Sequence, residues 1–361
     1  MWPTVSPDGK LVFYKAHQDD YVFTILIMDL ESGLQVELAS ENTPETESIH
    51  MLTAGGDLWP LGDGRYRAIY TAQHRNRDIV YIQDLIRSDD GRLELLGSKK
   101  AGFDPGSSDL IAISGVRFAT GPDKILFSGL SLDGYQDLYL ADLTLGRIER
   151  RLTRDLASDR MPVLWRDRIV FSSDRAKPSS TFAYHLFSYD LETGEIVQIT
   201  DSAGNELNPH PSPNGDRLFF QSDASGVSNI YEWTQSGAPR QLTDVATGVF
   251  TPSAVGSDTL LVSGFNDGEY RLHLVPISDV ADPAGSLPDL DIVIGAYYVE
   301  ENSLRCVRQP WQKGRISAAD MLASEPVESV PYRPAFSLDD FYASSEFGGA
   351  RSYNTSIFGS E

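Results

Sequence analysis

Short apolar segments separated by polar turns recur along most of this chain. The first turn, Ser6–Lys10, precedes the apolar segment Leu11–Tyr14, and a polar hairpin then leads to the apolar segment Ile25–Leu30. Short segments rich in β-branched and aromatic residues, bounded by Gly, Pro, Asn and Asp, are typical of β-strands. The pattern therefore predicts an all-β protein.

The same unit occurs six times. It consists of a turn, an apolar strand, a polar hairpin, a second strand that often ends in Asp-Leu, a Gly turn and a third strand. The turns fall at Asp8, Asp63, Asp123, Asp167, Asn214 and Asp258, in steps of 55, 60, 44, 47 and 44 residues. Such a period, with three or four short strands per unit, is typical of a propeller. We predict a six-bladed β-propeller over residues 1–276, because stacked blades cover both faces of each small sheet.

The recurring acidic residues have structural roles in this pattern. In Ser6-Pro7-Asp8-Gly9, Pro sets φ, Asp bonds back to the backbone and Gly permits the exit from the turn. Asp174 and Asp223 follow strands and are expected to cap the next turn. We therefore interpret these acids as scaffolding, although their number resembles catalytic material.

Charge limits the choice of partner. Acidic residues outnumber basic ones by 52 to 30, which gives a net charge of −22. Such a surface repels phosphate backbones, so we expect no nucleic acid partner. A cationic protein patch or a bound cation is electrostatically compatible, and so is an acidic surface that is simply solvated.

We predict no catalytic, cofactor-binding or metal-binding residue, and no cofactor. Cys306 is the single cysteine, so no intramolecular disulfide can form, and no histidine lies near it in sequence. No two of the six histidines have i, i+2 or i, i+4 spacing; they are His17, His50, His74, His185, His210 and His273. A propeller axis can still gather one side chain from each blade. His210, before the fifth turn, is the candidate to face the channel, the alternative being a hydrogen-bonded or exposed histidine.

With these motifs in hand, the chain resembles the TolB-like (WD-like) β-propeller repeat over residues 2–276, most closely from Arg151 to Leu274. That part is similar to the propeller of long Gram-negative envelope proteins, which have a metallopeptidase-like front and a C-terminal outer-membrane barrel of the surface-antigen type. Pro331–Asp339 is similar to the lead-in to that barrel. No His-Glu-x-x-His motif and no series of barrel strands occurs, so we expect a fragment or shortened relative. Residues 277–361 are then a partly disordered linker and irregular extension, in which Asp291–Tyr298 supplies a ring-closing strand.

The resemblance implies a non-catalytic scaffold for protein–protein interaction. We expect a monomer in the periplasm or at the outer membrane, with another envelope protein or peptide segment as partner and no membrane span in this chain. No signal peptide is visible at its start. The four longest inserts are the candidate partner surfaces, namely Lys15–Val22, Glu41–Leu58, Ala72–Asp78 and Arg175–Tyr184.

The alternative function is that of a propeller enzyme with its site at the central channel. Such an enzyme is a metal-dependent polysaccharide lyase or a peptidase-associated propeller. No Gly-x-Ser-x-Gly nucleophile motif occurs, which argues against a complete propeller-gated peptidase, although a propeller resembling that gate alone still fits. The chain is acidic and poor in histidine, which argues against the lyase. Three or more His or Arg residues converging at one mouth of the channel favour the enzyme.

Overall fold

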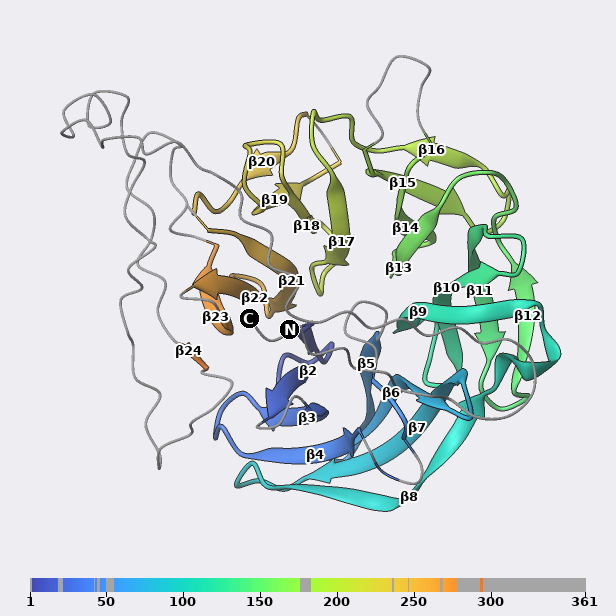
Figure 1. Cartoon of the computed structure of the whole chain (residues 1–361). Helices are drawn as coiled ribbons and strands as arrows, with labels where there is room; N and C mark the ends of the chain where they lie inside the picture. Colours follow the sequence, from blue (N-terminus) through green and yellow to red (C-terminus); the bar gives the residue numbers. More distant parts are fainter. Residues whose placement is uncertain are drawn as a thin grey trace, which may run out of the picture. The chain divides into compact units, whose positions relative to one another are not determined.

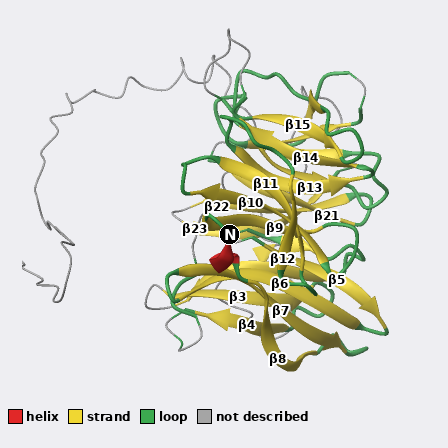
Figure 2. Ribbon diagram, turned by 90° about the vertical axis from the view of Figure 1, so that its right-hand side faces the viewer, coloured by secondary structure: helices red, strands yellow, loops and turns green. Residues whose placement is uncertain are grey.

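The described part of the chain forms six four-stranded antiparallel sheets, each built from four consecutive strands. The computed structural model describes residues 2–18, 22–41, 43, 46–49, 55–175, 183–235, 237–245, 247–266, 269–277 and 293–294. Figure 1 shows the sheets following one another as the blades of a ring, and Figure 2 shows them from the side. The prediction of an all-β, six-bladed propeller is confirmed.

The blades are numbered in chain order, and the first strand of each is the innermost. Blade 1 contains β1 (Thr4–Val5), β2 (Leu11–Gln18), β3 (Val22–Asp29) and β4 (Gln35–Ser40). Blade 2 contains β5 (Gly56–Gly62), β6 (Arg65–His74), β7 (Arg77–Arg87) and β8 (Leu93–Phe103). Blade 3 contains β9 (Leu110–Phe118), β10 (Lys124–Ser131), β11 (Gln136–Asp142) and β12 (Arg147–Arg151).

The second half of the ring has shorter outer strands. Blade 4 contains β13 (Asp159–Trp165), β14 (Arg168–Ser173), β15 (His185–Asp190) and β16 (Ile196–Gln198). Blade 5 contains β17 (Glu206–Pro211), β18 (Leu218–Ser222), β19 (Asn229–Trp233) and β20 (Arg240–Gln241). Blade 6 contains β21 (Val249–Val255), β22 (Thr259–Asn266), β23 (Glu269–Pro276) and β24 (Val293–Ile294).

The six turn residues identified from the sequence all lie between the first and second strands of a blade. We call this end of the blades the turn side, and the end with the hairpins between second and third strands the hairpin side. The prediction that Asp174 and Asp223 cap the turn after their strand was wrong, because their carboxylates reach back to the start of the first strand. The carboxylates of Asp174 and Asp223 accept backbone N–H groups of Ser158 and Asn205, at 2.6 Å in each case. These acids therefore tie each second strand to the start of the first strand.

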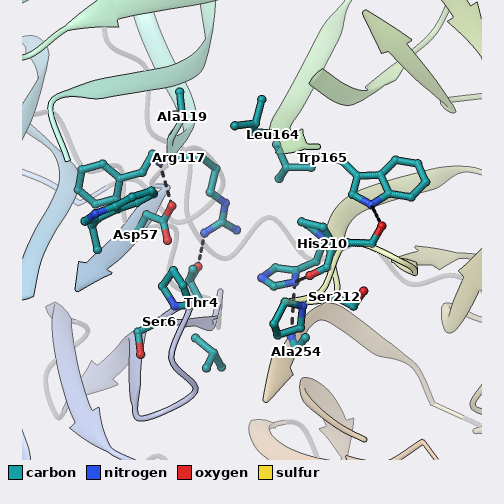
Figure 3. A pocket seen from close by; sticks show the side chains of 18 of the residues that line it. Thr4, Ser6, Asp57, Arg117, Ala119, Leu164, Trp165, His210, Ser212 and Ala254 are labelled. Carbon is teal, nitrogen blue, oxygen red and sulfur yellow. Dashed lines mark hydrogen bonds between the residues drawn. The ribbon is translucent and has the colours of Figure 1, made fainter. Parts of the chain in front are cut away.

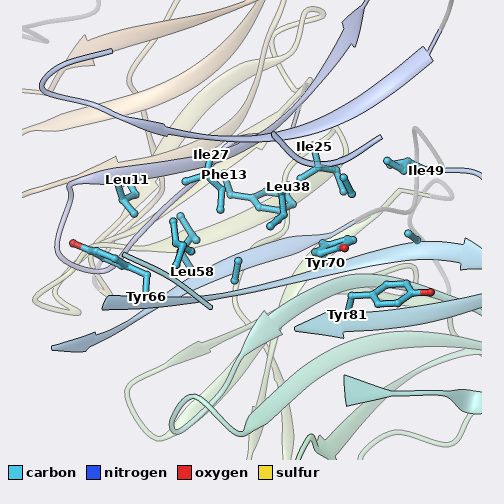
Figure 4. Close-up of a cluster of buried hydrophobic side chains, with 14 of the residues drawn as sticks. Leu11, Phe13, Ile25, Ile27, Leu38, Ile49, Leu58, Tyr66, Tyr70 and Tyr81 are labelled. Carbon is cyan, nitrogen blue, oxygen red and sulfur yellow. The ribbon is translucent and has the colours of Figure 1, made fainter. Parts of the chain in front are cut away.

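Six hydrophobic clusters fill the six interfaces between neighbouring blades. Consecutive residues of a second strand point to opposite interfaces. In β2, Leu11 and Phe13 pack towards blade 2, whereas Val12 and Tyr14 pack towards blade 6. Figure 4 shows the cluster between blades 1 and 2. A strand buried on both faces is apolar at every position, which explains the continuous apolar segments in the sequence.

The ring is closed by packing between the first and last blades. Leu261 and Leu272 of blade 6 are in contact with the cluster that holds Val12 and Tyr14 of blade 1. The backbone N–H of Val5 also donates to the Ser253 hydroxyl of β21 at 2.8 Å. Within the segment expected to close the ring, Val293–Ile294 instead pairs with β23 as the outermost strand of blade 6. The expected strand is present at these two residues, where it completes blade 6, while the contact between blades 6 and 1 is made by packing.

One of the four predicted inserts is a pair of strands rather than a loop. Within Ala72–Asp78, β6 runs to His74 and β7 begins at Arg77, so only Arg75 and Asn76 form the turn. Both have left-handed φ values of 51° and 59°, as a type I′ hairpin turn requires. The other three inserts lie partly outside the described residues. Residues 278–292 and 295–361, which include Cys306 and Pro331–Asp339, lie wholly outside them. In the described part of the chain, no helix is long and apolar enough to cross a membrane.

A threonine hydrogen bond recurs after the outer strand of three blades. The Thr153, Thr200 and Thr243 hydroxyls accept the backbone N–H of the third strand in blades 3, 4 and 5, at 2.9–3.0 Å. The outer strand is short in these blades. Beyond its end, the threonine hydroxyl accepts the third-strand N–H group that a longer outer strand would otherwise bind. This contact explains why the repeats end in Leu-Thr or Ile-Thr.

A buried ion pair connects blades 1 and 2 on the turn side. The Asp29 carboxylate has no exposed surface and accepts a hydrogen bond from Arg87 Nε at 2.5 Å. Burial by itself raises the pKa of Asp29, but the hydrogen bonds from Arg87 and Ser32 outweigh it, so the pKa lies below its ordinary value. Removing either partner leaves the other charge buried without compensation.

We predict that Arg87→Met lowers the free energy of unfolding by about 3 kcal/mol, because the Asp29 charge loses its partner. Since the Asp29 pKa is depressed, the wild-type pair stabilises the fold above pH ~4 and is lost as the pH falls below that value. Urea unfolding at pH 7 and pH 3 measures both effects. Arg92→Met, which removes the exposed pair with Asp90, serves as the control and should change little. Equal effects of the two variants contradict the prediction.

Candidate functional site

The innermost strands of four blades carry a β-bulge at the same place. The strand register shifts there, so that two residues of the inner strand face one residue of the second strand. The first bulge residue is left-handed in each case, with φ values of 51–62° at Gly115, Met161, Asn208 and Thr251. Left-handed backbone is unfavourable for Met and Thr. Bulges of this kind change the direction of the side chains that follow.

The residues two positions after the bulge residues are Arg117, Val163, His210 and Ser253. The first three line the central channel, whereas Ser253 is buried and contacts His210. In three blades a proline separates the bulge residue from this later residue, at positions 162, 209 and 252. A bulge leaves a backbone N–H without a ladder partner, and proline has none to leave. This x-Pro-x triplet begins six or seven residues before the turn residue of its blade. It is a sequence signal of the channel that the repeats alone did not indicate.

The channel contains two cavities. The turn-side cavity, of about 390 Å³, has apolar walls that include Pro7, Trp59, Phe118, Trp165 and Pro213. The hairpin-side cavity, of about 330 Å³, is lined by Trp2, Ala112, Ser114, Arg160 and Asn208 among others. Three residues, Thr4, Arg117 and Val163, line both cavities. They therefore form the partition between the two.

Arg117 is the central residue of this partition. Its Nη1 donates to the Thr4 hydroxyl and to the Gly56 carbonyl, the latter at 2.8 Å. Figure 3 shows the guanidinium projecting from β9 into the space between Thr4 and His210. Within the described part of the chain, Arg117 forms no ion pair and its remaining N–H groups have no acceptor. Burial lowers the pKa of Arg117 and the charge on Asp57 opposes this shift, but a guanidinium keeps its proton in proteins.

Asp57 is the carboxylate whose charge acts on Arg117. Its two oxygens accept the backbone N–H groups of Leu58 and Phe118, each at 2.9 Å. Burial raises the pKa of Asp57, although the charge on Arg117 and the two backbone N–H groups act in the opposite direction. Asp57 therefore holds blades 2 and 3 together and leaves Arg117 bonded only to neutral oxygens.

His210 faces the channel, as its position before the fifth turn indicated. Its Nε2 lies 3.1 Å from the Ser253 hydroxyl, and its Nδ1 lies 3.0 Å from the Pro211 carbonyl. Burial, helped by the charge on Arg117, lowers the pKa of His210 to about 3. The side chain is thus a neutral, hydrogen-bonded histidine, which was the alternative stated for it.

The other histidines whose side chains the structure describes do not join this site. His185 is buried in blade 4, where its Nδ1 contacts Glu206 at 2.9 Å, and His273 is buried in β23. His74 ends β6, whereas His50 and the side chain of His17 lie outside the described residues. A search of the described residues finds no group of three His, Cys, Asp or Glu residues able to hold a metal ion.

The turn-side cavity does contain three His or Arg residues, the number set out above as favouring an enzyme. They are Arg117, Arg166 and His210. Arg166 is held by blade 5, where its Nε donates to the Gly215 carbonyl at 2.8 Å and its Nη1 to Gln235 at 3.1 Å. Because Arg166 is engaged outside the partition, the three side chains do not converge on one point.

We predict that His210 stays neutral from pH 7 down to about pH 4, because burial and Arg117 oppose its protonation. The pKa is depressed from its ordinary 6.5 to about 3. The unfolded chain therefore binds the proton first, and the free energy of unfolding falls as the pH drops below 6.5. Long-range ¹⁵N NMR of the imidazole measures the titration, with His210→Gln to identify the signal. Arg117→Met should raise the pKa, and titration of the wild type near pH 6.5 contradicts the assignment.

Comparison with known proteins identifies the fold. No protein-family model and no curated protein matches the chain. Among solved structures, TolB from Acinetobacter baumannii is similar with 16% identity and a TM-score of 0.54, over 75% of this chain and 62% of that one. The putative TolB from Agrobacterium tumefaciens is similar with 16% identity and a TM-score of 0.51, over 73% of this chain and 86% of that one. A puromycin hydrolase is similar with 12% identity and a TM-score of 0.51, over 81% of this chain and 56% of that one. The chain thus spans less than two thirds of the first of these proteins. The likeness is to the fold alone, which is the TolB-like six-bladed β-propeller.

Proposed function

We propose that this chain is a non-catalytic scaffold that binds a segment of another protein at the turn-side mouth of its channel. The observation that carries the proposal is the apolar turn-side cavity, which opens between the turns of several blades. Pro7, Pro213 and Asn214 form exposed parts of its rim. Concave, mostly apolar sites with a few polar groups are the usual places where ligands bind.

The contacts of His210 favour binding over catalysis. Ser253 is completely buried, and its oxygen already accepts the Val5 N–H. A nucleophile must reach the substrate, and a general base needs a pKa near the working pH. A buried serine and a histidine with a pKa of about 3 meet neither condition. The contact between them is therefore better explained as support for the channel wall.

The setting of the proposed scaffold is the bacterial envelope. This step relies on analogy with TolB proteins at the level of the fold. The relation to envelope proteins that continue into an outer-membrane barrel is part of the same proposal. A puromycin hydrolase shares the fold, so a peptidase-associated role is the competing proposal.

The first test is a selection of peptides from a random display library against the purified chain. We expect selected peptides to bind the double variant Pro7→Glu, Asn214→Glu at least about tenfold more weakly, because the changes fill and charge the rim of the turn-side cavity. Leu156→Glu is the matched control, since Leu156 is 81% exposed and lies before β13 on the hairpin side. Peptides that bind the rim variant as tightly as the wild type contradict the proposal.

A second test addresses catalysis. We expect no cleavage of polygalacturonate or of a casein substrate by the full chain, with or without added Ca²⁺, Mn²⁺ or Zn²⁺. Ultraviolet absorbance measures unsaturated lyase products, and fluorescence measures peptide release. Turnover that is abolished by His210→Gln supports the enzyme and overturns the scaffold proposal.

A further inference from the structure

We infer that Arg117 is a carboxylate-binding site at the partition of the channel. The inference rests on the proposed function for its place in the channel and names the chemical group recognised there. The carboxylate belongs either to an acidic residue or C-terminus of a bound peptide, or to a small free acid. The observations that carry it are the position of Arg117 between two cavities and the absence of an ion-pair partner for it among the described residues.

The geometry leaves the arginine available to a ligand. Among the described residues, only Nη1 of Arg117 is engaged, by the Thr4 hydroxyl and the Gly56 carbonyl, and both are neutral acceptors. A guanidinium presents five N–H donors in a planar fork that matches the two oxygens of a carboxylate. The bonds to Thr4 and Gly56 hold the fork in place, so binding orders few additional bonds.

The charges around Arg117 favour a singly charged ligand. Asp57 lies close enough to affect the pKa of Arg117, and the chain as a whole carries a net charge of −22. His210, on the other side of the guanidinium, is neutral at pH 7. A carboxylate adds one negative charge beside Asp57, whereas a phosphate adds close to two and is repelled more strongly. The site therefore suits a carboxylate better than a phosphate.

Three polar groups of the remaining wall are already engaged by hydrogen bonds. The Ser6 hydroxyl donates to Asp8 at 2.7 Å, and the Ser212 hydroxyl donates to Asp216 at 2.8 Å. The Trp165 indole N–H donates to the Gly215 carbonyl at 3.0 Å. With these groups engaged, a fitting ligand combines one carboxylate with apolar or aromatic neighbours.

The test uses matched probes that differ only in charge. For the peptide source we use acetyl-Phe-Glu-Pro-amide and its neutral Gln analogue, and for the free acid 3-phenylpropionate and its amide. Binding to the full chain is followed by tryptophan fluorescence, because Trp59 and Trp165 line the cavity, and by calorimetry. We expect at least one acid to bind about tenfold more tightly than its neutral partner, as a charge-assisted hydrogen bond predicts. The pair that shows the preference identifies the source.

Three variants separate recognition from loss of structure. Arg117→Met should abolish the preference for the acid, while Arg166→Met, which removes a charge from the same cavity, should preserve it. Because Arg117→Met also removes the bonds to Thr4 and Gly56, its melting temperature is measured in parallel. Asp57→Asn removes the neighbouring negative charge and should increase affinity for the acid several-fold. A damaged fold does not produce that increase.

Several results overturn the inference. Equal binding of acid and neutral probes, tighter binding of phenyl phosphate than of 3-phenylpropionate, or a preference that survives Arg117→Met each exclude carboxylate recognition at this residue. Absence of binding by all four probes at millimolar concentration has the same meaning. The proposed function is decided separately by the rim variants. Peptides that bind the rim variant more weakly but bind Arg117→Met as tightly as the wild type support the scaffold proposal and contradict only this inference.

Discussion

Burial of both faces of every blade is the constraint on which this structure depends. A small twisted sheet cannot cover its own faces, and here each face packs against the next blade through one of six apolar clusters. The cluster between blades 1 and 6 is of the same kind as the others. The ring is therefore closed by side-chain packing and not by an exchanged strand. The buried pair of Asp29 and Arg87 adds a polar connection between two blades, but apolar contact holds all six.

The channel follows from what the inner strands must do at the axis. A regular first strand directs its residues into the interfaces between blades. The bulges at Gly115, Met161, Asn208 and Thr251 break that alternation, and in blades 3, 4 and 5 a residue two positions later lines the channel. In two of these blades the residue is polar and faces a cavity, as Arg117 and His210 do. A left-handed Thr or Met costs on the order of 1–3 kcal/mol. The surrounding ladder and clusters offset this cost.

The repeat could be predicted because it is written in local chemistry. Turn residues such as Asp8 and Asn214 mark where strands reverse, and the apolar segments between them mark strands with two buried faces. The prediction that Ala72–Asp78 is a long insert was wrong for a local reason as well. Arg75 and Asn76 both adopt left-handed conformations, and only the second is a residue that favours them. The x-Pro-x triplets at Pro162, Pro209 and Pro252 were present in the sequence, but their meaning depends on knowing which strand is innermost.

The sequence by itself determined the fold class, the number of blades, the turn positions and the scaffolding role of the recurring acids. It also singled out His210 as the candidate to face the channel, with a hydrogen-bonded or exposed histidine as the alternative. Only the tertiary structure decided that Arg117 stands at the axis without an ion-pair partner among the described residues, and that Asp57 is occupied by backbone N–H groups. The physical reason is that turn and strand preferences act between residues close in sequence. The environment of a channel residue is built by blades far apart in sequence, as the contact between His210 and Ser253 illustrates.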